Sequence, residues 1–319
     1  MSVRPSITAV EGILVGHVTH SAAGTGCTVI LAPPGGMVAA AYVRGRATGT
    51  RELDAVSVEH LVPAINAILL TGGSAFGLGA ADGVMRWLAE RGRGFNVKVG
   101  VVPIVPAAVV FDLSPVGSPG VWPGPADGYR ACEVASPDVA EGSVGAGTGA
   151  TVGKVLGAGG AMKGGVGTWA ETTGGVTVGA LAVVNAFGDV RDATGAIVAG
   201  ARRDGGFVDA RAYLASGGVP GGAFAQAGVN TTLVVVATDA AMDKVALREV
   251  ARMAADALGQ RISPVGTQYD GDVVFAASCG GREARPVMVE LLAQAVTATA
   301  VERAVRLAKG TNDVPGLAG

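Results

Sequence analysis

The chain has 319 residues, of which 49% are apolar and 16% charged, and its formal net charge is −2. This balance provides no strongly positive surface for nucleic acid or anionic membranes, so we expect neither as a partner. Glycine occurs 52 times, over twice its usual share of about 7%. Because these glycines follow no three-residue period, we interpret them as tight turns and close backbone approaches between packed layers.

Cysteines and histidines give no sign of a disulfide framework or a metal site. The three cysteines, Cys27, Cys132 and Cys279, are odd in number and far apart. His17 and His20 lack a third ligand nearby, so we interpret them as ordinary loop residues. The N-terminal residues lack the apolar segment of a signal peptide, and no run of about 18 apolar residues could span a membrane. We therefore expect a cytoplasmic protein with no cofactor, no metal and no membrane partner.

The N-terminal third of the chain alternates short apolar runs with glycine-containing turns. Residues 26–31 and 37–43 are expected to be strands paired around the turn at 33–36. A buried strand at 66–70 leads into a helix with apolar residues at helical spacing over 78–88. The turn between this strand and helix departs from the G-x-G-x-x-G pattern, so we set a dinucleotide site aside.

The middle of the chain contains a glycine–alanine tract that includes Lys154 and Lys163. Residues 176–184 form an apolar run typical of a core strand, and Asn185 lies at the end of this strand. Residues 191–228 have loop composition. That is long for a structureless connection in a compact fold, and long loops are often functional or processed.

The last part of the chain begins with a strand that starts at Thr231. Asp239 is expected to be the N-cap of a helix, 273–277 a core strand and 287–309 a closing helix. Strands that are apolar on both faces must be buried on both faces. Two sheets stacked between helices satisfy this requirement. We therefore predict an α+β fold, an αββα sandwich of the kind that N-terminal-nucleophile hydrolases use.

The stretch from Ala227 to Asp239 leads small, turn-prone residues into an apolar strand, with Thr231 at the entry. A threonine at a chain N-terminus can act as a nucleophile, because its own α-amine serves as the base. Such a terminus requires a cut between Asn230 and Thr231. The alternatives are an ordinary strand start, where threonine is favoured by β-propensity, or a chance match to the N-glycosylation sequon at Asn230-Thr231-Thr232.

Several motifs, in the same order along nearly the whole chain, resemble one family. They are Val10–His17 (VEGILVGH), Gly26–Val29 (GCTV), Leu70–Asp82 (LTGGSAFGLGAAD), Gly145–Lys154 (GAGTGATVGK), Lys163–Gly167 (KGGVG) and Asn230–Asp239 (NTTLVVVATD). The family is the DmpA-type L-aminopeptidase D-amidase/D-esterase family, which includes β-peptidyl aminopeptidases and the 6-aminohexanoate-oligomer endo-hydrolases called nylon hydrolases. The resemblance implies an αββα fold, self-cleavage into two chains and a homo-oligomer, expected as a tetramer of processed heterodimers.

The resemblance places the nucleophile at Thr231 and two polar residues near it, Lys154 and Asn185. It also places a pair of acids at Asp270 and Asp272. A cation at Lys154 would keep the Thr231 amine neutral, and the Asn185 amide could donate to the oxyanion of a tetrahedral intermediate. Asp270 and Asp272 flank a glycine, where they could orient the amine or bind a cationic substrate end. The simpler alternatives are a solvated lysine, a turn asparagine and an acidic turn that caps a strand.

We therefore expect a single hydrolase domain, residues 1–319, that cuts its own Asn230–Thr231 bond into chains 1–230 and 231–319. The mature Thr231 would attack a substrate amide and form an acyl-enzyme that water hydrolyses. Threonine here is similar to the nylon-hydrolase branch, whereas the family's aminopeptidases have serine. The substrate stays open among peptides, D-amino-acid amides, β-peptides and 6-aminohexanoate oligomers. Two alternatives are an acyltransferase, which would pass the acyl group to an amine, and a non-catalytic binding protein.

Overall fold

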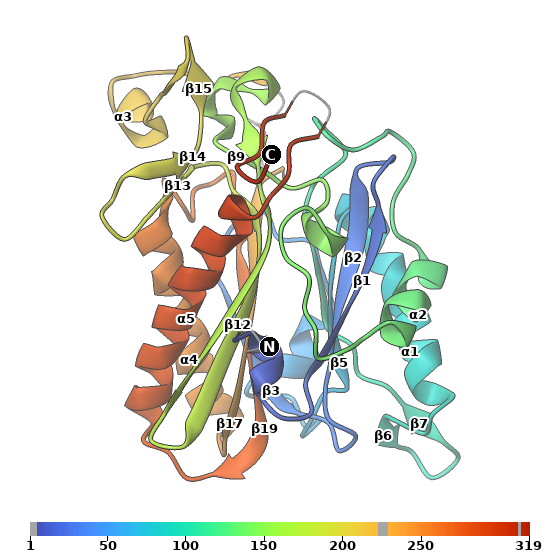
Figure 1. Ribbon diagram of the computed structural model, residues 1–319. Helices are drawn as coiled ribbons and strands as arrows, with labels where there is room; N and C mark the ends of the chain where they lie inside the picture. The colour runs from blue at the N-terminus through green and yellow to red at the C-terminus, as the bar shows by residue number, and fades with distance from the viewer. Residues whose placement is uncertain (1–4, 223–228, 312–313) are drawn as a thin grey trace.

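The computed structural model describes residues 5–222, 229–311 and 314–319. Two five-stranded sheets lie face to face, and helices cover the outer face of each (Figure 1). The first sheet has the order β1 (Leu14–His20), β2 (Thr25–Leu31), β5 (Ala67–Thr71), β8 (Ala107–Val109) and β4 (Thr50–Arg51). The second has the order β11 (Gly165–Thr173), β12 (Val176–Asn185), β17 (Thr231–Ala240), β19 (Val273–Arg282) and β3 (Val38–Val43).

Four α-helices form the outer layers. The first sheet is covered by α1 (Ala80–Ala89) and α2 (Pro125–Glu133), the second by α4 (Lys244–Arg261) and α5 (Pro286–Arg306) (Figure 1). Short strand pairs lie outside the main sheets: β6 (Phe95–Asn96) with β7 (Val101–Val102), and β9 (Thr151–Val152) with β10 (Met162–Lys163). The 3-10 helices are η1 (Ile7–Ala9), η2 (Leu53–Val56), η3 (Ser74–Gly79), η4 (Gly145–Gly147), η5 (Lys154–Leu156) and η6 (Ala158–Gly160).

Apolar side chains of the central strands serve two layers of the core at once. Leu233 and Val235 of β17 belong to the core between the two sheets. Val234 and Val236 belong to the core under α4 and α5, because successive side chains of a strand point to opposite faces. Every residue of β12 is buried, which explains why this run has no polar face in the sequence. The predicted αββα architecture is confirmed.

The strand that carries Thr231 lies in the middle of the second sheet. On one side β17 runs antiparallel to β12, with Thr231 opposite Asn185, the last residue of β12. On the other side β17 runs parallel to β19, with Leu233 opposite Val273. The C-terminal end of β12 and the N-terminal ends of β17 and β19 therefore lie at the same end of the sheet. Asp272, which directly precedes β19, lies beside the start of β17.

The expected pairing of 26–31 with 37–43 is wrong. The first run forms β2, which pairs with β1 and β5, and the second forms β3, which pairs with β19 in the other sheet. The turn between them, closed by a 2.9 Å hydrogen bond from Gly36 N–H to Pro33 O, carries the chain from one sheet to the other. Because both runs are apolar on both faces, the local sequence gives no preference between pairing together and pairing with distant strands.

Residues expected as a loop after position 191 contain regular structure. They form β14 (Ile197–Ala199), the hairpin of β15 (Arg202–Arg203) and β16 (Gly206–Phe207), and α3 (Ala210–Ala215); β14 joins β13 (Asp189–Arg191) and β18 (Ile262–Ser263) in a sheet. The buried Asp189 carboxylate accepts hydrogen bonds from the N–H groups of Ala201 (2.8 Å) and Ala210 (2.7 Å). The Asp189 carboxylate thus holds two parts of this segment together. Hydrophobic periodicity in the sequence cannot predict such a contact. Residues 223–228, at the end of the expected loop, lie outside the described residues.

Helix α4 begins later than expected, because Asp239 belongs to strand β17. The N-cap is Asp243, whose Oδ1 accepts a 2.8 Å hydrogen bond from the N–H of Ala246. The Asp239 carboxylate instead accepts from the N–H of Thr177 (2.8 Å) and pairs with Arg282 (3.0 Å). Asp239 therefore stabilises the end of β17 that is far from Thr231.

Candidate active site

Thr231 is 3% exposed, and its side chain contacts the peptide group that precedes it. The hydroxyl Oγ1 donates a hydrogen bond to the carbonyl oxygen of Asn230 at 2.6 Å. The backbone N–H of Gly271 donates to the same oxygen at 2.7 Å. Preorganised donors at this range polarise a carbonyl group and stabilise negative charge that develops on its oxygen. The geometry thus brings a hydroxyl next to a polarised peptide carbonyl.

Gly271 can make this contact only because it has no side chain. A Cβ added at this position would lie 2.4 Å from the carbonyl oxygen of Ala47 and 2.8 Å from Thr231 Oγ1. The backbone between Asp270 and Asp272 therefore packs directly against the start of β17. This close approach explains why a glycine separates the two acids.

Lys154 is completely buried at the start of η5. Its Nζ donates to Asn185 Oδ1 (2.8 Å), to the Asn185 backbone oxygen (3.0 Å) and to the Val229 backbone oxygen (3.4 Å). Three acceptors require three N–H groups, which only the ammonium form has. Burial lowers the pKa of Lys154 to about 7, against the opposing effect of the Asp270 charge. Lys154 and Asn185, which the resemblance placed near Thr231, are in direct hydrogen-bonding contact with each other.

The Asn185 side chain is completely buried and hydrogen-bonded at both ends of its amide. Oδ1 accepts from Lys154 Nζ and from the N–H of Thr151, the latter at 3.0 Å. Nδ2 donates to the carbonyl oxygen of Phe111 at 3.1 Å. Because one of the two amide hydrogens binds Phe111, at most one is left to serve an oxyanion.

The two acids lie on the other side of the start of β17. Asp270 Oδ2 accepts from the N–H (2.9 Å) and hydroxyl (2.7 Å) of Thr267. Asp272 Oδ1 accepts from the N–H of Thr232 at 2.6 Å, while its Oδ2 has no hydrogen-bond partner among the described residues. Burial raises the pKa of both acids, and burial together with the Asp270 charge brings that of Asp272 to about 8. The site thus holds an acid with an unused acceptor next to Thr231.

Two further buried charges lie near Asn185, and the sequence provided no role for either. Lys163 is 1% exposed, and its Nζ donates to the carbonyl oxygens of Thr148 (2.6 Å) and Ala150 (2.9 Å). Asp112 is completely buried and follows Phe111, whose carbonyl binds Asn185. The available signals were a lysine inside a small-residue tract and an acid that directly follows an apolar run. Neither signal distinguishes a buried charge from a solvated one.

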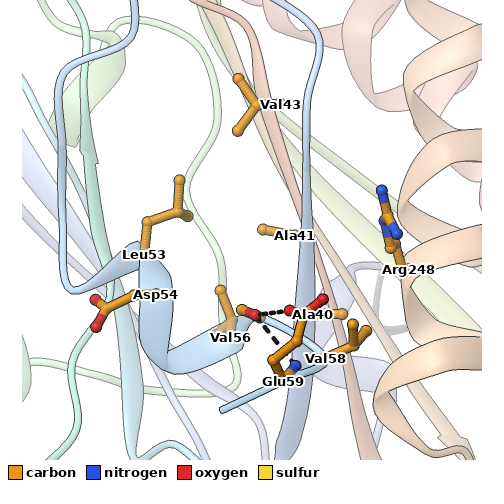
Figure 2. Close-up of a pocket in the computed structure, with 10 residues that line it drawn as sticks. Ala40, Ala41, Val43, Leu53, Asp54, Val56, Val58, Glu59 and Arg248 are labelled. Atoms are coloured by element: carbon orange, nitrogen blue, oxygen red, sulfur yellow. Dashed lines mark hydrogen bonds between the residues drawn. The ribbon is translucent and has the colours of Figure 1, made fainter.

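The cavity drawn in Figure 2 is separate from this site. Its volume is about 350 Å³, and it lies beside the edge strand β3, between η2 and α4. Its wall is mostly apolar, with Glu59 and Arg248 among its polar residues (Figure 2). None of the residues predicted for catalysis lines it. We therefore place the candidate chemistry at the start of β17 and assign none to this cavity.

Metal sites, disulfides and membrane-spanning helices are absent from the described part of the chain. Within it, no group of three or more His, Cys, Asp or Glu side chains is arranged to hold a metal ion. The three cysteines are free thiols, and two of them are buried. Within the same residues, every helix is too short or too polar to cross a bilayer.

Comparison with known proteins identifies the family. The model of peptidase family S58 matches residues 5–312. The chain belongs to peptidase family S58. Over 290 residues it is 47% identical to an uncharacterized aminopeptidase of Mycobacterium tuberculosis, covering 86% of this chain and 81% of that protein. Over 282 residues it is 32% identical to a 6-aminohexanoate-oligomer endohydrolase of Kocuria sp., covering 84% of this chain and 73% of that protein. This S58 member is therefore a hydrolase of amide bonds.

Solved structures with the same architecture include enzymes of this kind. A β-aminopeptidase of Burkholderia sp. matches with a TM-score of 0.71 at 21% identity, covering 98% of this chain and 90% of that one. The L-aminopeptidase D-Ala-esterase/amidase of Ochrobactrum anthropi, described as a variant of the N-terminal-nucleophile-hydrolase fold, matches with a TM-score of 0.71 at 22% identity, covering 96% and 87%. These matches confirm that the S58 chain has the predicted N-terminal-nucleophile-hydrolase-like fold.

Proposed function

We propose that this S58 member is an N-terminal-threonine amide hydrolase that matures by cutting its own Asn230–Thr231 bond. The observation that carries the proposal is the pair of hydrogen bonds on the Asn230 carbonyl, from Thr231 Oγ1 at 2.6 Å and from Gly271 N–H at 2.7 Å. Denaturing gel electrophoresis of purified, incubated protein, with N-terminal sequencing of the small chain, is the test. We expect two chains, the smaller beginning at Thr231, and a single intact chain would contradict the proposal.

Self-cleavage needs one nucleophile and one stabilised oxyanion. Thr231 Oγ attacks the carbonyl carbon of Asn230, and the Gly271 N–H stabilises the negative charge on the carbonyl oxygen. The C–N bond breaks, the nitrogen takes up the proton that the Thr231 hydroxyl gives up, and the acyl group now forms an ester with Oγ. Water hydrolyses this ester, which leaves residues 1–230 with a new carboxylate and residues 231–319 with a free α-amine.

Cleavage changes the charge of the site, because it creates an α-amine beside the two acids. Asp272 Oδ1 already binds the N–H of Thr232, and Asp272 Oδ2 has no partner among the described residues of the intact chain. We therefore expect Asp272 to accept a hydrogen bond from the new amine of Thr231. The nearby Lys154 ammonium disfavours a second positive charge, so it favours the neutral amine that can act as a base.

The proposed substrate is the amide bond of a small peptide or of an ω-amino acid, including 6-aminohexanoate oligomers. The relatives named as aminopeptidases and as 6-aminohexanoate-oligomer endohydrolases support this class. Thr231 Oγ would attack the amide, and the remaining Asn185 amide hydrogen would stabilise the oxyanion. The test is a panel of α-peptides, D-amino-acid amides, β-peptides and 6-aminohexanoate oligomers on the processed enzyme. Products measured with and without an added amine distinguish hydrolysis from acyl transfer.

We also propose that the processed protein is a cytoplasmic homo-oligomer, a tetramer of cleaved heterodimers. The support for the homo-oligomer is what the resemblance to this family implies. Light scattering coupled to size-exclusion chromatography measures the assembly mass. A mass equal to one heterodimer would contradict the proposed tetramer.

Replacing the side chain before the cut should matter little. We expect Asn230→Ala to cleave within about tenfold of the wild-type rate, because the attacked carbonyl belongs to the backbone and keeps its bond from Gly271. The measurement is the fraction of intact chain over time on a denaturing gel. A variant that stays uncut while retaining the wild-type melting temperature would assign the Asn230 side chain a direct part in the cut.

The acid pair should matter most for substrates with a free amine. If Asp272 and Asp270 bind a substrate ammonium, Asp272→Asn should raise KM for amino-terminal substrates by roughly tenfold or more and leave KM for N-blocked substrates nearly unchanged. Matched substrate pairs, free and N-acetylated, measured on the processed variant provide the test. Equal effects on both members of a pair would show that the acids act only through the Thr231 amine or the fold and do not bind the substrate ammonium.

A further inference from the structure

The neighbours of the Asn185 amide allow only one orientation of it. Lys154 Nζ (2.8 Å) and Thr151 N–H (3.0 Å) are donors, so they require the oxygen end. The Phe111 carbonyl (3.1 Å) is an acceptor, so it requires the nitrogen end. Two backbone groups, the Thr151 N–H and the Phe111 carbonyl, therefore decide where the remaining amide hydrogen points.

Asp112 holds the segment that carries the Phe111 carbonyl. Its Oδ1 accepts from the N–H of Gly73 and its Oδ2 from the hydroxyl of Thr25, both at 2.7 Å. Gly73 lies just after β5 and Thr25 begins β2. The acid thus ties the residues after β8 to two other strands of the first sheet. A shift of the Phe111 carbonyl would require one of these bonds to break.

Lys163 holds the segment that carries the Thr151 N–H. Its Nζ donates to the carbonyl oxygens of Thr148 (2.6 Å) and Ala150 (2.9 Å). Ala150 directly precedes Thr151, so the lysine fixes the backbone on the N-terminal side of that N–H. A buried ammonium requires such acceptors, and the backbone in turn takes the position that the ammonium dictates.

The acid and the lysine belong to one packed unit. Gly149, between the two carbonyls that bind Lys163, is so close to Asp112 that a Cβ added at Gly149 would lie 2.5 Å from Asp112 Cβ. Burial lowers the pKa of Lys163 to about 7, and the Asp112 charge opposes that change. Burial raises the pKa of Asp112 to about 6, opposed by its two hydrogen bonds and by the Lys163 charge. Each charge therefore favours the ionised form of the other.

We propose that Asp112 and Lys163 form a positioning pair, one for each backbone contact of Asn185, and that the pair sets the direction of the Asn185 amide during self-cleavage and hydrolysis. The inference rests on the proposed function. It differs from a purely structural role because it predicts a loss in kcat that is larger than any loss of stability explains.

The test uses two variants that remove the charges and keep the shapes. Asp112→Asn replaces the Oδ2 acceptor with an NH2 group, which breaks the bond donated by Thr25 and removes the charge that favours ionised Lys163. Lys163→Met removes the ammonium and keeps the apolar stem. We expect each to slow self-cleavage and to lower kcat about 10- to 100-fold, because a misplaced catalytic group costs this much, with KM within about threefold. In the double variant the two losses should not multiply. Cell-free synthesis followed by denaturing gels measures self-cleavage, and steady-state kinetics on the processed fraction give kcat and KM.

Asp239→Asn is the matched control. Like Asp112, Asp239 accepts a hydrogen bond from a backbone N–H, that of Thr177 at 2.8 Å. Asp239 lies in the second sheet, at the end of β17 that is far from Thr231. We expect this variant to lower the melting temperature about as much as Asp112→Asn and to leave both rates within about twofold. Thr25→Val, which removes one bond to Asp112 and no charge, should cause a smaller loss in kcat.

Wild-type rates in a folded Asp112→Asn variant would overturn the inference and leave the proposed function standing. If Asp112→Asn does not fold, Thr25→Val decides, and an unchanged kcat in that variant overturns the inference. A loss in kcat that Asp239→Asn reproduces at equal melting temperature also overturns it. A wild-type protein that neither cleaves itself nor hydrolyses any amide would overturn the proposed function and this inference together.

Discussion

The Thr231→Ala variant should remain one chain of 319 residues and hydrolyse no amide. The substitution removes the oxygen that lies 2.6 Å from the Asn230 carbonyl oxygen and that serves both the cut and the turnover in the proposed mechanism. The chain should still fold, because loss of one hydroxyl costs about 1 kcal/mol against a stability of roughly 5–15 kcal/mol. A denaturing gel, an amide-hydrolysis assay and a melting curve on the same sample provide the measurement.

Thr231→Ser is the control for this loss. Serine keeps the oxygen and loses the methyl group that restricts χ1, so we expect it to cleave more slowly but to completion. If Thr231→Ala is cut at the same bond, or if the small chain of the wild type begins anywhere else, the proposed nucleophile is wrong.

The Lys154→Met variant should cleave itself and hydrolyse substrate about 100-fold more slowly than the wild type, or worse. Methionine removes the donor that binds Asn185 Oδ1 at 2.8 Å and the Val229 carbonyl, just before the cut site, at 3.4 Å. It also removes the only cation that we assign to keep the Thr231 amine neutral. The rate of loss of intact chain, and kcat of any processed fraction, provide the measurement.

Lys244→Met controls for the loss of a lysine that binds several carbonyls. Lys244 Nζ donates to the carbonyl oxygens of Ala55 (3.0 Å), Ser57 (3.1 Å) and His60 (3.1 Å), so its removal leaves a similar set of acceptors without a donor. We expect this variant to lose stability but to cleave at close to the wild-type rate. Equal losses of activity in both variants would show that Lys154 acts only through the fold.

The pKa of Lys154 adds a pH test to the same variant. The folded-state pKa is about 7, below the ordinary value of 10.5, so between these pH values the unfolded chain binds more protons than the folded chain. Stability from this group therefore rises with pH across that window. The comparison uses the uncut Thr231→Ala protein, with Lys154 either kept or replaced by methionine. The melting temperature of the protein that keeps Lys154, minus that of the Lys154→Met protein, should increase as the pH rises from about 7 to 10. A constant difference would contradict the lowered pKa.

The sequence by itself determined the layered architecture and the position of Thr231 at the start of a core strand. Residues 176–184 and the run after Thr231 have no polar face, and a strand without a polar face is stable only when both faces are buried. The sandwich of two sheets between helices follows from that requirement, and β12 and β17 do lie at its centre. The motifs from Val10 to Asp239 added the family, which the match over residues 5–312 confirms.

Only the tertiary structure decided which strands pair and which backbone groups surround the site. The sequence prediction joined β2 to β3, although each has its partners elsewhere, because partner choice depends on the total area buried and not on the local pattern. The Gly271 N–H on the Asn230 carbonyl is likewise a contact between segments far apart in the chain. Lys163 and Asp112 looked like ordinary polar residues, since a residue type does not reveal whether its charge is solvated or buried. Only the folded structure shows that both are buried, next to the two backbone segments that bind the Asn185 amide.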